Sequence, residues 1–534
     1  MFLNIFLIFL ICLLIDFSVG TLVEPSIWPE PMSITYKNES AVKPISSKLI
    51  WIVDGGNIDT LNDLFNRYMK MMFIHPTPDP TSPNNDNDET RTIFVQVKDR
   101  SEEYPQLETS EYYELRIEEN SAEIYLKADT IYGVIRGVET LAQITVYDFD
   151  ELMYRTPTLI VKDQPRYLHR GMLLDTSRHF QPITFLRKTI DALSYSKYNV
   201  LHWHVVDTQS FPFQSQTSPK LWEGSYTKNE RYSTQDMIAL VEYGRRRGVK
   251  VMIEFDVPGH QASWCTGYPQ ICPSTTCLQP LNPASDDTMP LVEGLLKECT
   301  TIMSEDQKQA LFPYKLIHLG GDEVDYKCWN KSPEIQEWQK QQGYEGDGNE
   351  DTYKYFVDGV SKMALDLNRL PVQWVEVFEH FGSDLRKDTI VHVWKEKTTL
   401  DEVVQAGYKA LLSNQNDWYL DHETTSWETM YENEPTSDLT DPSTASLILG
   451  GESCMWAENV DISVLENTVW PRAAAVAERL WTPKDKMDVV RAADRIETFR
   501  CVLATRGIGA APVKNHYARK APKEPGSCYD QRRR

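Results

Sequence analysis

A repeating pattern that begins near residue 166 restricts the fold of this chain more than any other feature. Apolar runs of strand length, each followed by polar or acidic residues, alternate with amphipathic stretches of helical length. Eight such runs occur, at 171–175, 200–207, 249–256, 316–322, 371–376, 390–394, 409–413 and 447–452. Eight consecutive β-α units are typical of a (β/α)8 TIM barrel, so we expect an α/β fold with the barrel over residues 166–534.

The preceding part of the chain, residues 21–165, has a different pattern. Strand-like runs at 48–53, 92–97 and 112–117 are mixed with helical apolar spacing at 58–73 and 131–144. This mixture predicts a smaller α+β domain in front of the barrel.

The first 20 residues are almost continuously apolar and end in a small residue, Gly20. Asp16 interrupts the apolar run after about fourteen residues, fewer than the roughly twenty that span a bilayer. We therefore predict a cleaved signal peptide over 1–20, and an uncleaved anchor is the less favoured alternative. No later segment of the sequence is long and apolar enough to span, so we expect no stable membrane span after cleavage.

The predicted export route has two chemical consequences. An oxidising compartment favours disulfides among the cysteines beyond the signal, and proximity in the sequence suggests Cys265 with Cys272. Asn38 and Asn330 each begin an Asn-x-Ser sequon, so both are predicted glycosylation sites.

The overall charge excludes some classes of partner. The formal net charge is −23 at pH 7, which would repel nucleic acid and anionic membrane surfaces. The glycine pair Gly320-Gly321 has no following lysine and precedes acids, so it does not resemble a phosphate-binding loop.

The ends of the eight apolar runs carry the chemistry, because in a TIM barrel functional side chains stand at the carboxyl ends of the strands. Every run is followed closely by acids, histidines or tryptophans. Tryptophan faces stack on sugar rings, and carboxylates accept from hydroxyls or exchange protons with a glycosidic oxygen. The pattern therefore predicts a glycan substrate.

A metal site is the main alternative for some of these residues. His202, His204, Asp207, Asp256 and His260 are all of ligand type. However, the sequence has neither a His-Glu-x-x-His helix nor cysteines at ligand spacing, and the first two histidines share one face of a strand, as structural histidines can. We expect no metal and no cofactor.

Two adjacent carboxylates, Asp322 and Glu323, are the sharpest single signal. Consecutive residues point in different directions and cannot flank one glycosidic bond from opposite sides, as the usual retaining pair does. The nucleophile must then come from elsewhere, and a 2-acetamido group of the substrate can supply it. One acid would protonate the leaving oxygen while its neighbour stabilises the acetamido nitrogen.

The sequence resembles glycoside hydrolase family 20, the β-N-acetylhexosaminidases, and in particular their lysosomal branch. The likeness spans nearly the whole mature chain and is densest at 169–180, 199–207, 254–260, 318–324 and 470–481, with His-x-Gly-Gly-Asp-Glu at 318–323 as the most specific motif. The resemblance implies an exo-acting enzyme that removes terminal β-linked N-acetylglucosamine or N-acetylgalactosamine.

The resemblance also assigns roles. It implies that Glu323 is the acid and then base, that Asp322 orients the acetamido group, and that Asp207 and His260 form a relay to Glu323. It further assigns Tyr419 to the acetamido oxygen. The remaining residues would bind or wall the sugar: Arg178, Trp374, Trp394, Asp421, Trp456 and Glu458.

Further expectations come from the same resemblance. It suggests the pairs Cys277 with Cys328 and Cys501 with Cys528, a homodimer, and a location in lysosomes or outside the cell. The chain has Thr208 where many relatives have a second aspartate, which puts a secondary contact in doubt.

A second departure concerns substrate choice. Asp421-His422 lacks the fixed cationic neighbour of forms that accept sulfated sugars, so we expect neutral substrates.

Two other functions fit part of the pattern. A glycan-binding protein with an inactivated barrel would have lost Asp322, Glu323 or Tyr419, and all three are present. An endo-acting chitinase-like barrel typically has its acids at alternating positions, whereas these two are contiguous.

Overall fold

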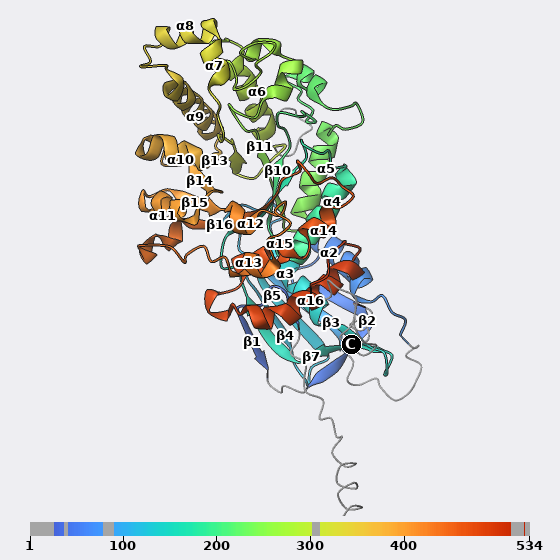
Figure 1. The fold of residues 1–534 in the computed structure, drawn as a ribbon. Helices are drawn as coiled ribbons and strands as arrows, with labels where there is room; N and C mark the ends of the chain where they lie inside the picture. The colour runs from blue at the N-terminus through green and yellow to red at the C-terminus, as the bar shows by residue number, and fades with distance from the viewer. Residues whose placement is uncertain (1–25, 37–40, 78–89, 302–309, 514–527, 529–534) are drawn as a thin grey trace, which may run out of the picture.

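A computed structural model describes residues 26–36, 41–77, 90–301, 310–513 and 528. The predicted signal peptide and Asn38 lie outside these ranges. Figure 1 shows a barrel in the upper part of the view and a second sheet below it, with α3 (Ile131–Ile144) and α16 (Val489–Thr505) between them. Among the described residues, no helix is long and apolar enough to cross a membrane.

Eight parallel strands close into a barrel, which confirms the predicted fold class. Their order around the barrel is β10-β11-β12-β13-β14-β15-β16-β9. The strands are β9 (His169–Asp175), β10 (Val200–His204), β11 (Lys250–Glu254), β12 (Leu316–His318), β13 (Leu370–Trp374), β14 (Ile390–Val393), β15 (Lys409–Leu412) and β16 (Ile448–Met455). Each overlaps one of the eight predicted apolar runs.

Several strands end earlier than their apolar runs predict, among them the three neighbours β10, β11 and β12. Strand β10 ends at His204, β11 at Glu254 and β12 at His318. Both His204 and His318 pair in register with Glu254. Single backbone hydrogen bonds continue beyond this level, from the Phe255 amide to the His318 carbonyl and from the Val257 amide to the Leu319 carbonyl. The strands themselves have ended, so the acids beyond them stand on loops. These loops can direct their carboxylates over the barrel end.

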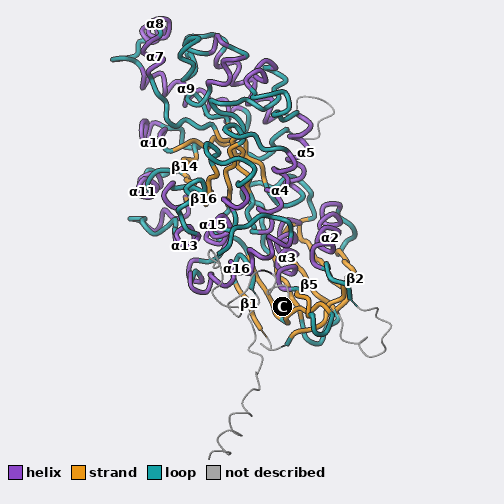
Figure 2. Tube along the Cα trace, turned by 45° about the vertical axis from the view of Figure 1, so that its right-hand side comes forward, coloured by secondary structure: helices purple, strands orange, loops and turns teal. Residues whose placement is uncertain are grey.

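Helices surround the barrel (Figure 2). They include α4 (Ile183–Tyr195), α5 (Thr234–Arg245), α6 (Thr288–Thr300), α9 (Asn349–Asp366), α11 (Lys397–Gln405) and α15 (Arg472–Trp481). The side chain of Ser233 caps α5 in a capping box with Asp236, which fixes where that helix begins. Short helices in the loops, such as α7 (Lys327–Lys331) and α12 (Gln415–Trp418), were not predicted, because so few residues show no periodicity.

The N-terminal part forms one eight-stranded sheet in the order β1-β8-β4-β5-β3-β2-β7-β6. Its strands are β1 (Ser33–Tyr36), β2 (Val42–Val53), β3 (Thr90–Asp99), β4 (Tyr113–Ile117), β5 (Glu123–Thr130), β6 (Val146–Asp148), β7 (Met153–Pro157) and β8 (Leu159–Asp163). Helices α2 (Asp59–Met72) and α3 pack on it. At Gly133 of α3 a Cβ would lie 2.3 Å from the Tyr112 carbonyl oxygen, so glycine permits this close approach.

Buried ion pairs join the sheet to the barrel. Glu111 pairs with Arg136 of α3 and with Arg170 of β9, and Lys197, just after α4, pairs with Asp163 of β8. All five side chains are at most 6% exposed. We call these five residues the interdomain charge cluster.

The described part of the chain contains three disulfides, and they are the three predicted pairs. Cys265–Cys272 lies in the loop after β11, and Cys277–Cys328 ties that loop to α7 after β12. The third, Cys501–Cys528, joins α16 to the C-terminal segment. Of the described cysteines, Cys299 and Cys454 form no disulfide and are buried.

Candidate active site

The loop after β12 presents the two adjacent acids, Asp322 and Glu323. Gly320 has a positive φ of 63°, and a Cβ there would lie 1.9 Å from Oδ1 of Asp256. Glu323 has a φ of 47°, in the left-handed region that non-glycine residues rarely occupy. Backbone strain of this kind collects at functional sites, and here it turns the Glu323 side chain outward, where it is 61% exposed.

His260 meets both acids. Its Nε2 lies 3.6 Å from Oδ2 of Asp322 and 3.7 Å from Oε2 of Glu323, while its Nδ1 is 3.1 Å from Oδ1 of Asp207. Burial opposes a charge on His260, but Asp256, Asp322 and Asp207 raise its pKa well above the usual value. The structure thus brings together the predicted relay of Asp207, His260 and Glu323.

Arg178 lies among carboxylates on the opposite side of Asp207. Its Nη2 is 2.7 Å from Oδ2 of Asp207, and its Nη1 is 3.0 Å from Asp175 and 3.4 Å from Glu458. Its guanidinium carbon lies 5.4 Å from the centre of the Trp456 ring. These contacts hold the guanidinium at the rim of the barrel.

Aromatic side chains form a box next to Asp322. The Trp374 and Trp456 rings lie 6.1 Å apart, Trp394 stacks at 6.3 Å from Tyr419, and Tyr419 lies 6.2 Å from Trp456. They cluster with Leu173 and Cys454 of the barrel interior. Trp374 is only 1% exposed, so it forms the floor of this box while the others form its sides.

Three site residues carry a buried polar atom without a hydrogen-bond partner among the described residues. These atoms are Oδ1 of Asp322, Nε2 of His260 and Oδ1 of Asp421. Burial raises the pKa of Asp421 to about 6. Unpaired buried polar groups are costly, and a sugar that offers an amide and hydroxyls would satisfy them.

The structure adds acids that were not predicted as site residues. Asp256 accepts from the Gly321 amide at 2.8 Å, and burial together with Asp322 raises its pKa well above the usual range. Glu376 accepts from Nε1 of Trp394 at 2.9 Å, and burial and Asp322 raise its pKa to about 7. Asp175, which holds Arg178, is a third. All three stand at strand ends, and that position is the signal that could have found them.

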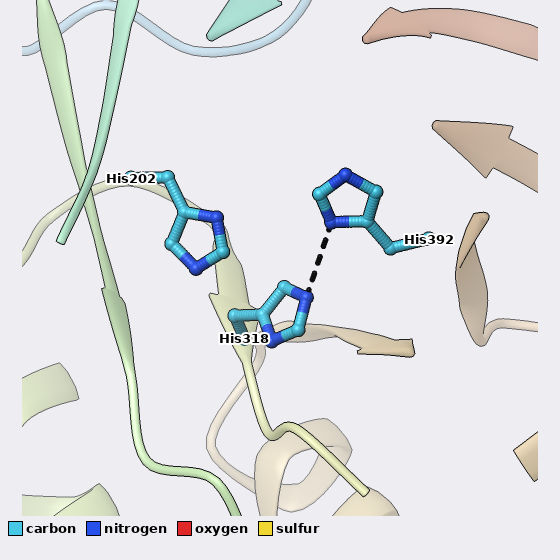
Figure 3. Close-up of side chains that lie close together, drawn as sticks. All are labelled: His202, His318 and His392. Atoms are coloured by element: carbon cyan, nitrogen blue, oxygen red, sulfur yellow. Dashed lines mark hydrogen bonds between the residues drawn. The ribbon is translucent and has the colours of Figure 1, made fainter. Parts of the chain in front are cut away.

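Three histidines from alternate barrel strands lie close together (Figure 3), and each is in ring contact with Trp374. His202, His318 and His392 could offer three ligand atoms within 4.8 Å of one another. However, Nε2 of His318 already lies 3.2 Å from Nδ1 of His392, whose Nε2 is 2.6 Å from Ser413, and Nδ1 of His202 is 2.7 Å from Glu452. A metal would have to displace these bonds, so the arrangement favours a hydrogen-bonded network.

The predicted structural role of His202 and His204 is supported by their contacts, because both are buried between carboxylates. Asn330 is exposed on α7, where its Oδ1 accepts from Asn349 at 2.8 Å.

Comparisons with known proteins agree with the family expected from the motifs. Residues 167–484 match "Glycosyl hydrolase family 20, catalytic domain", and residues 27–144 match "beta-acetyl hexosaminidase like". Beta-hexosaminidase 1 of Arabidopsis thaliana is 38% identical over 526 residues, which cover 95% of this chain and 94% of the relative. The beta subunit of human beta-hexosaminidase (Homo sapiens) is 34% identical over 94% of this chain and 91% of its own.

A solved structure shares the architecture. The chitobiase of Flavobacterium johnsoniae has a TM-score of 0.77 and 27% sequence identity, with 90% of this chain and 73% of that chain covered. The chain therefore belongs to glycosyl hydrolase family 20 and is a glycoside hydrolase of its β-hexosaminidase group.

Proposed function

We propose that the enzyme releases terminal, non-reducing β-linked N-acetylglucosamine or N-acetylgalactosamine from glycoconjugates or chitooligosaccharides. The observation that carries this proposal is the convergence of Asp322 and Glu323 on one nitrogen of His260, beside an aromatic box. Two acids in that arrangement do not face each other across a glycosidic bond. The substrate then has to supply the nucleophile, and N-acetyl sugars can do so.

Glu323 is the acid and base in this proposal. Its carboxyl group is the more exposed of the pair and can reach a leaving oxygen, to which it delivers a proton. After the sugar amide has formed its cyclic intermediate, the same carboxylate takes a proton from water. His260 and Asp207 hold Glu323 in place from the side of the barrel.

Asp322 and the aromatic box bind the acetamido group in this proposal. Asp322 is 14% exposed, and its carboxylate would accept from the amide N–H and stabilise the positive charge that develops there. Tyr419 would donate to the amide oxygen, while Trp374, Trp394 and Trp456 enclose the methyl group. Arg178, Asp421 and Glu458 would bind ring hydroxyls.

The first test is Glu323→Gln on chitobiose, whose leaving group needs a proton. We expect kcat to fall about 1,000-fold, as general acid catalysis supplies about that much. Asp325→Asn, in the same loop with an exposed side chain that pairs with Lys327, is the matched control and should keep wild-type kcat. Full activity in Glu323→Gln would overturn the assignment.

A second test addresses the nucleophile. Replacing the N-acetyl group of an aryl glycoside by its trifluoroacetyl analogue weakens the carbonyl oxygen, so the rate should fall steeply. An unchanged rate would exclude substrate assistance. Product analysis with a chitin oligomer should show monomer release from the start, whereas internal cleavage would indicate an endo-acting enzyme, and binding without turnover a glycan-binding protein.

Several properties of the whole protein remain part of this proposal. We infer domains over 21–165 and 166–534, glycosylation at Asn38 and Asn330, and a homodimer in lysosomes or outside the cell. The three disulfides support a secretory route. We also infer a preference for neutral substrates, because no fixed cation among the described residues is paired with Asp421: Nε2 of His422 lies 4.0 Å from its Oδ2. Comparing hydrolysis of a 6-sulfated substrate with that of the neutral one tests this preference.

A further inference from the structure

Glu254, the last residue of β11, links the floor of the aromatic box to the relay. Its Oε1 accepts from Nε1 of Trp374 at 2.9 Å, and its Oε2 lies 2.6 Å from Nδ1 of His204. Nε2 of the same His204 ring lies 2.7 Å from Oδ2 of Asp207. One carboxylate thus connects, through single hydrogen bonds, a residue of the sugar pocket and a residue of the relay.

The surroundings make this carboxylate rigid. Glu254 is fully buried, and two more imidazole nitrogens lie close to it: Nδ1 of His318 at 2.9 Å and Nε2 of His202 at 3.0 Å. Burial opposes its charge, but His318, His204 and His202 lower the pKa of Glu254 well below its usual range. Glu254 and Asp207 in turn raise the pKa of His204 to about 10, against burial. His204 is therefore an imidazolium held between two carboxylates.

The tryptophan on the other oxygen is held from both sides. The Trp374 ring stacks on His392, with centroids 4.4 Å apart, and lies 4.5 Å from His318. Stacking sets the plane of the indole, and the bond to Glu254 sets its rotation within that plane. A shift of Glu254 would therefore move Trp374 and His204 together.

We propose that Glu254 is a positioning residue that fixes Asp207, through His204, and the aromatic floor in one shared geometry. This inference rests on the proposed function of Asp207 and Trp374. It adds to that function a residue that contacts the floor of the pocket from the barrel interior and reaches Asp207 only through His204.

The barrel offers a matched control, Glu452 on β16. It is as buried as Glu254, and its carboxylate lies 2.5 Å from Nε2 of His169 and 2.7 Å from Nδ1 of His202. Among the described residues, Glu452 makes no hydrogen bond or ion pair with Trp374 or His204. Glu452→Gln therefore removes the same buried charge without cutting the link to Asp207.

The experiment is a double-mutant cycle measured as kcat/KM for chitobiose, whose leaving group needs a proton from Glu323. We expect Glu254→Gln to lose about 30-fold and Asp207→Asn about 100-fold, while Glu452→Gln stays within about threefold of wild type. The part of the Glu254 effect that passes through Asp207 is already lost in Asp207→Asn, so the Glu254→Gln/Asp207→Asn double variant should lose clearly less than the product of the two single losses. Independent effects would instead multiply to about 3,000-fold.

The outcomes separate the two levels of inference. A multiplicative double variant, or equal losses in Glu254→Gln and Glu452→Gln, overturns the positioning role while leaving the proposed function intact. Absence of hydrolysis by the wild-type enzyme overturns the proposed function itself.

A second measurement needs no change at Glu254, in case that variant does not fold. Short hydrogen bonds between an imidazolium and a carboxylate give proton NMR signals far downfield. The signal that disappears in His204→Gln is the one that belongs to His204. The signal of the His204 Nδ1–H proton that faces Glu254 should shift in Asp207→Asn and again in Trp374→Phe. An unmoved signal in both variants overturns the inference.

Discussion

The interdomain charge cluster is buried, whereas the acidic rim of the barrel is only partly buried; by this rim we mean Asp207, Asp256, Asp322, Glu323, Glu376 and Asp421. Both regions consist of charged side chains, but their charges are matched differently. In the cluster, Glu111 bonds to two arginines, and Lys197 bonds to Asp163. At the rim, acids outnumber cations, and Oδ1 of Asp322 and of Asp421 are unpartnered among the described residues.

The difference shows what each region does. A complete set of bonds resists change, so the cluster stabilises the contact between sheet and barrel. At the rim, some polar atoms lack hydrogen-bond partners among the described residues, and this is unfavourable until a ligand supplies such partners. The rim is therefore suited to binding a substrate and to acid–base chemistry. Mutations should therefore separate activity from stability between the two regions.

The largest expected effect is at the rim. Asp322→Asn removes the carboxylate that would face the acetamido nitrogen, so kcat should fall about 1,000-fold. The melting temperature should not fall, because the change relieves repulsion with Asp256 and Glu376. Steady-state kinetics and a thermal melt on the same sample check both parts, and a strongly lowered melting temperature would contradict the comparison.

The opposite result is expected in the cluster. Glu111→Gln leaves Arg136 and Arg170 buried without a carboxylate, which should cost about 3 kcal/mol of unfolding free energy. Activity per folded molecule should stay within about twofold of wild type, since the cluster lies away from the acids of the rim. Urea unfolding monitored by circular dichroism measures the loss, with kinetics at low denaturant as the control.

The pH dependence of stability should also differ. Burial and Asp322 raise the pKa of Glu376 from 4.5 to about 7, so its contribution to stability is present below pH 4.5 and lost as pH rises through 7. The loss should be about 3 kcal/mol. The pKa of Glu111 is instead lowered to about 2, against burial, by Arg170 and Arg136, so its contribution is full above pH 4.5 and lost as pH falls through 2.

Unfolding at pH 4.5 and 7.5 separates these contributions. In Glu376→Gln, the free energy of unfolding should fall less between the two pH values than in wild type. In Glu111→Gln, it should fall by the same amount as in wild type, from a lower starting value. A decline that is unchanged in Glu376→Gln would place the titrating group elsewhere.

The smallest effect concerns the wall of the box. Trp394→Phe removes the bond from Nε1 to Glu376 but keeps an aromatic face, so KM should rise about threefold with little change in kcat. Trp338→Phe, on α8 (Pro333–Gln341) and away from the box, is the control and should leave KM unchanged. Equal KM values for the two variants would remove Trp394 from the binding site.

Much of this site could be predicted without coordinates. The barrel follows from eight apolar runs because alternating strand and helix periods leave few other architectures. Asp322 and Glu323 are adjacent in the chain. Local backbone geometry alone therefore prevents them from lying on opposite sides of one glycosidic bond. Asp175, Asp256 and Glu376 also stand at strand ends, but the family resemblance assigned no site role to them.

Pairwise contacts could not be predicted in the same way. Glu254 lies 50 residues from His204 and 120 from Trp374 in the sequence, and no periodic pattern indicates which side chains meet across the barrel. The early ends of β10, β11 and β12 likewise depend on their register with one another.

The sequence by itself determined the fold class, the family and the chemistry of the acid pair, because these depend on local periodicity and on residues that are neighbours in the chain. Only the tertiary structure decided which charges are matched. Closing the barrel brings His204, Glu254 and His318 to one level and leaves Asp322 and Asp421 with unpaired atoms, since sheet register and loop direction are set by packing over the whole domain.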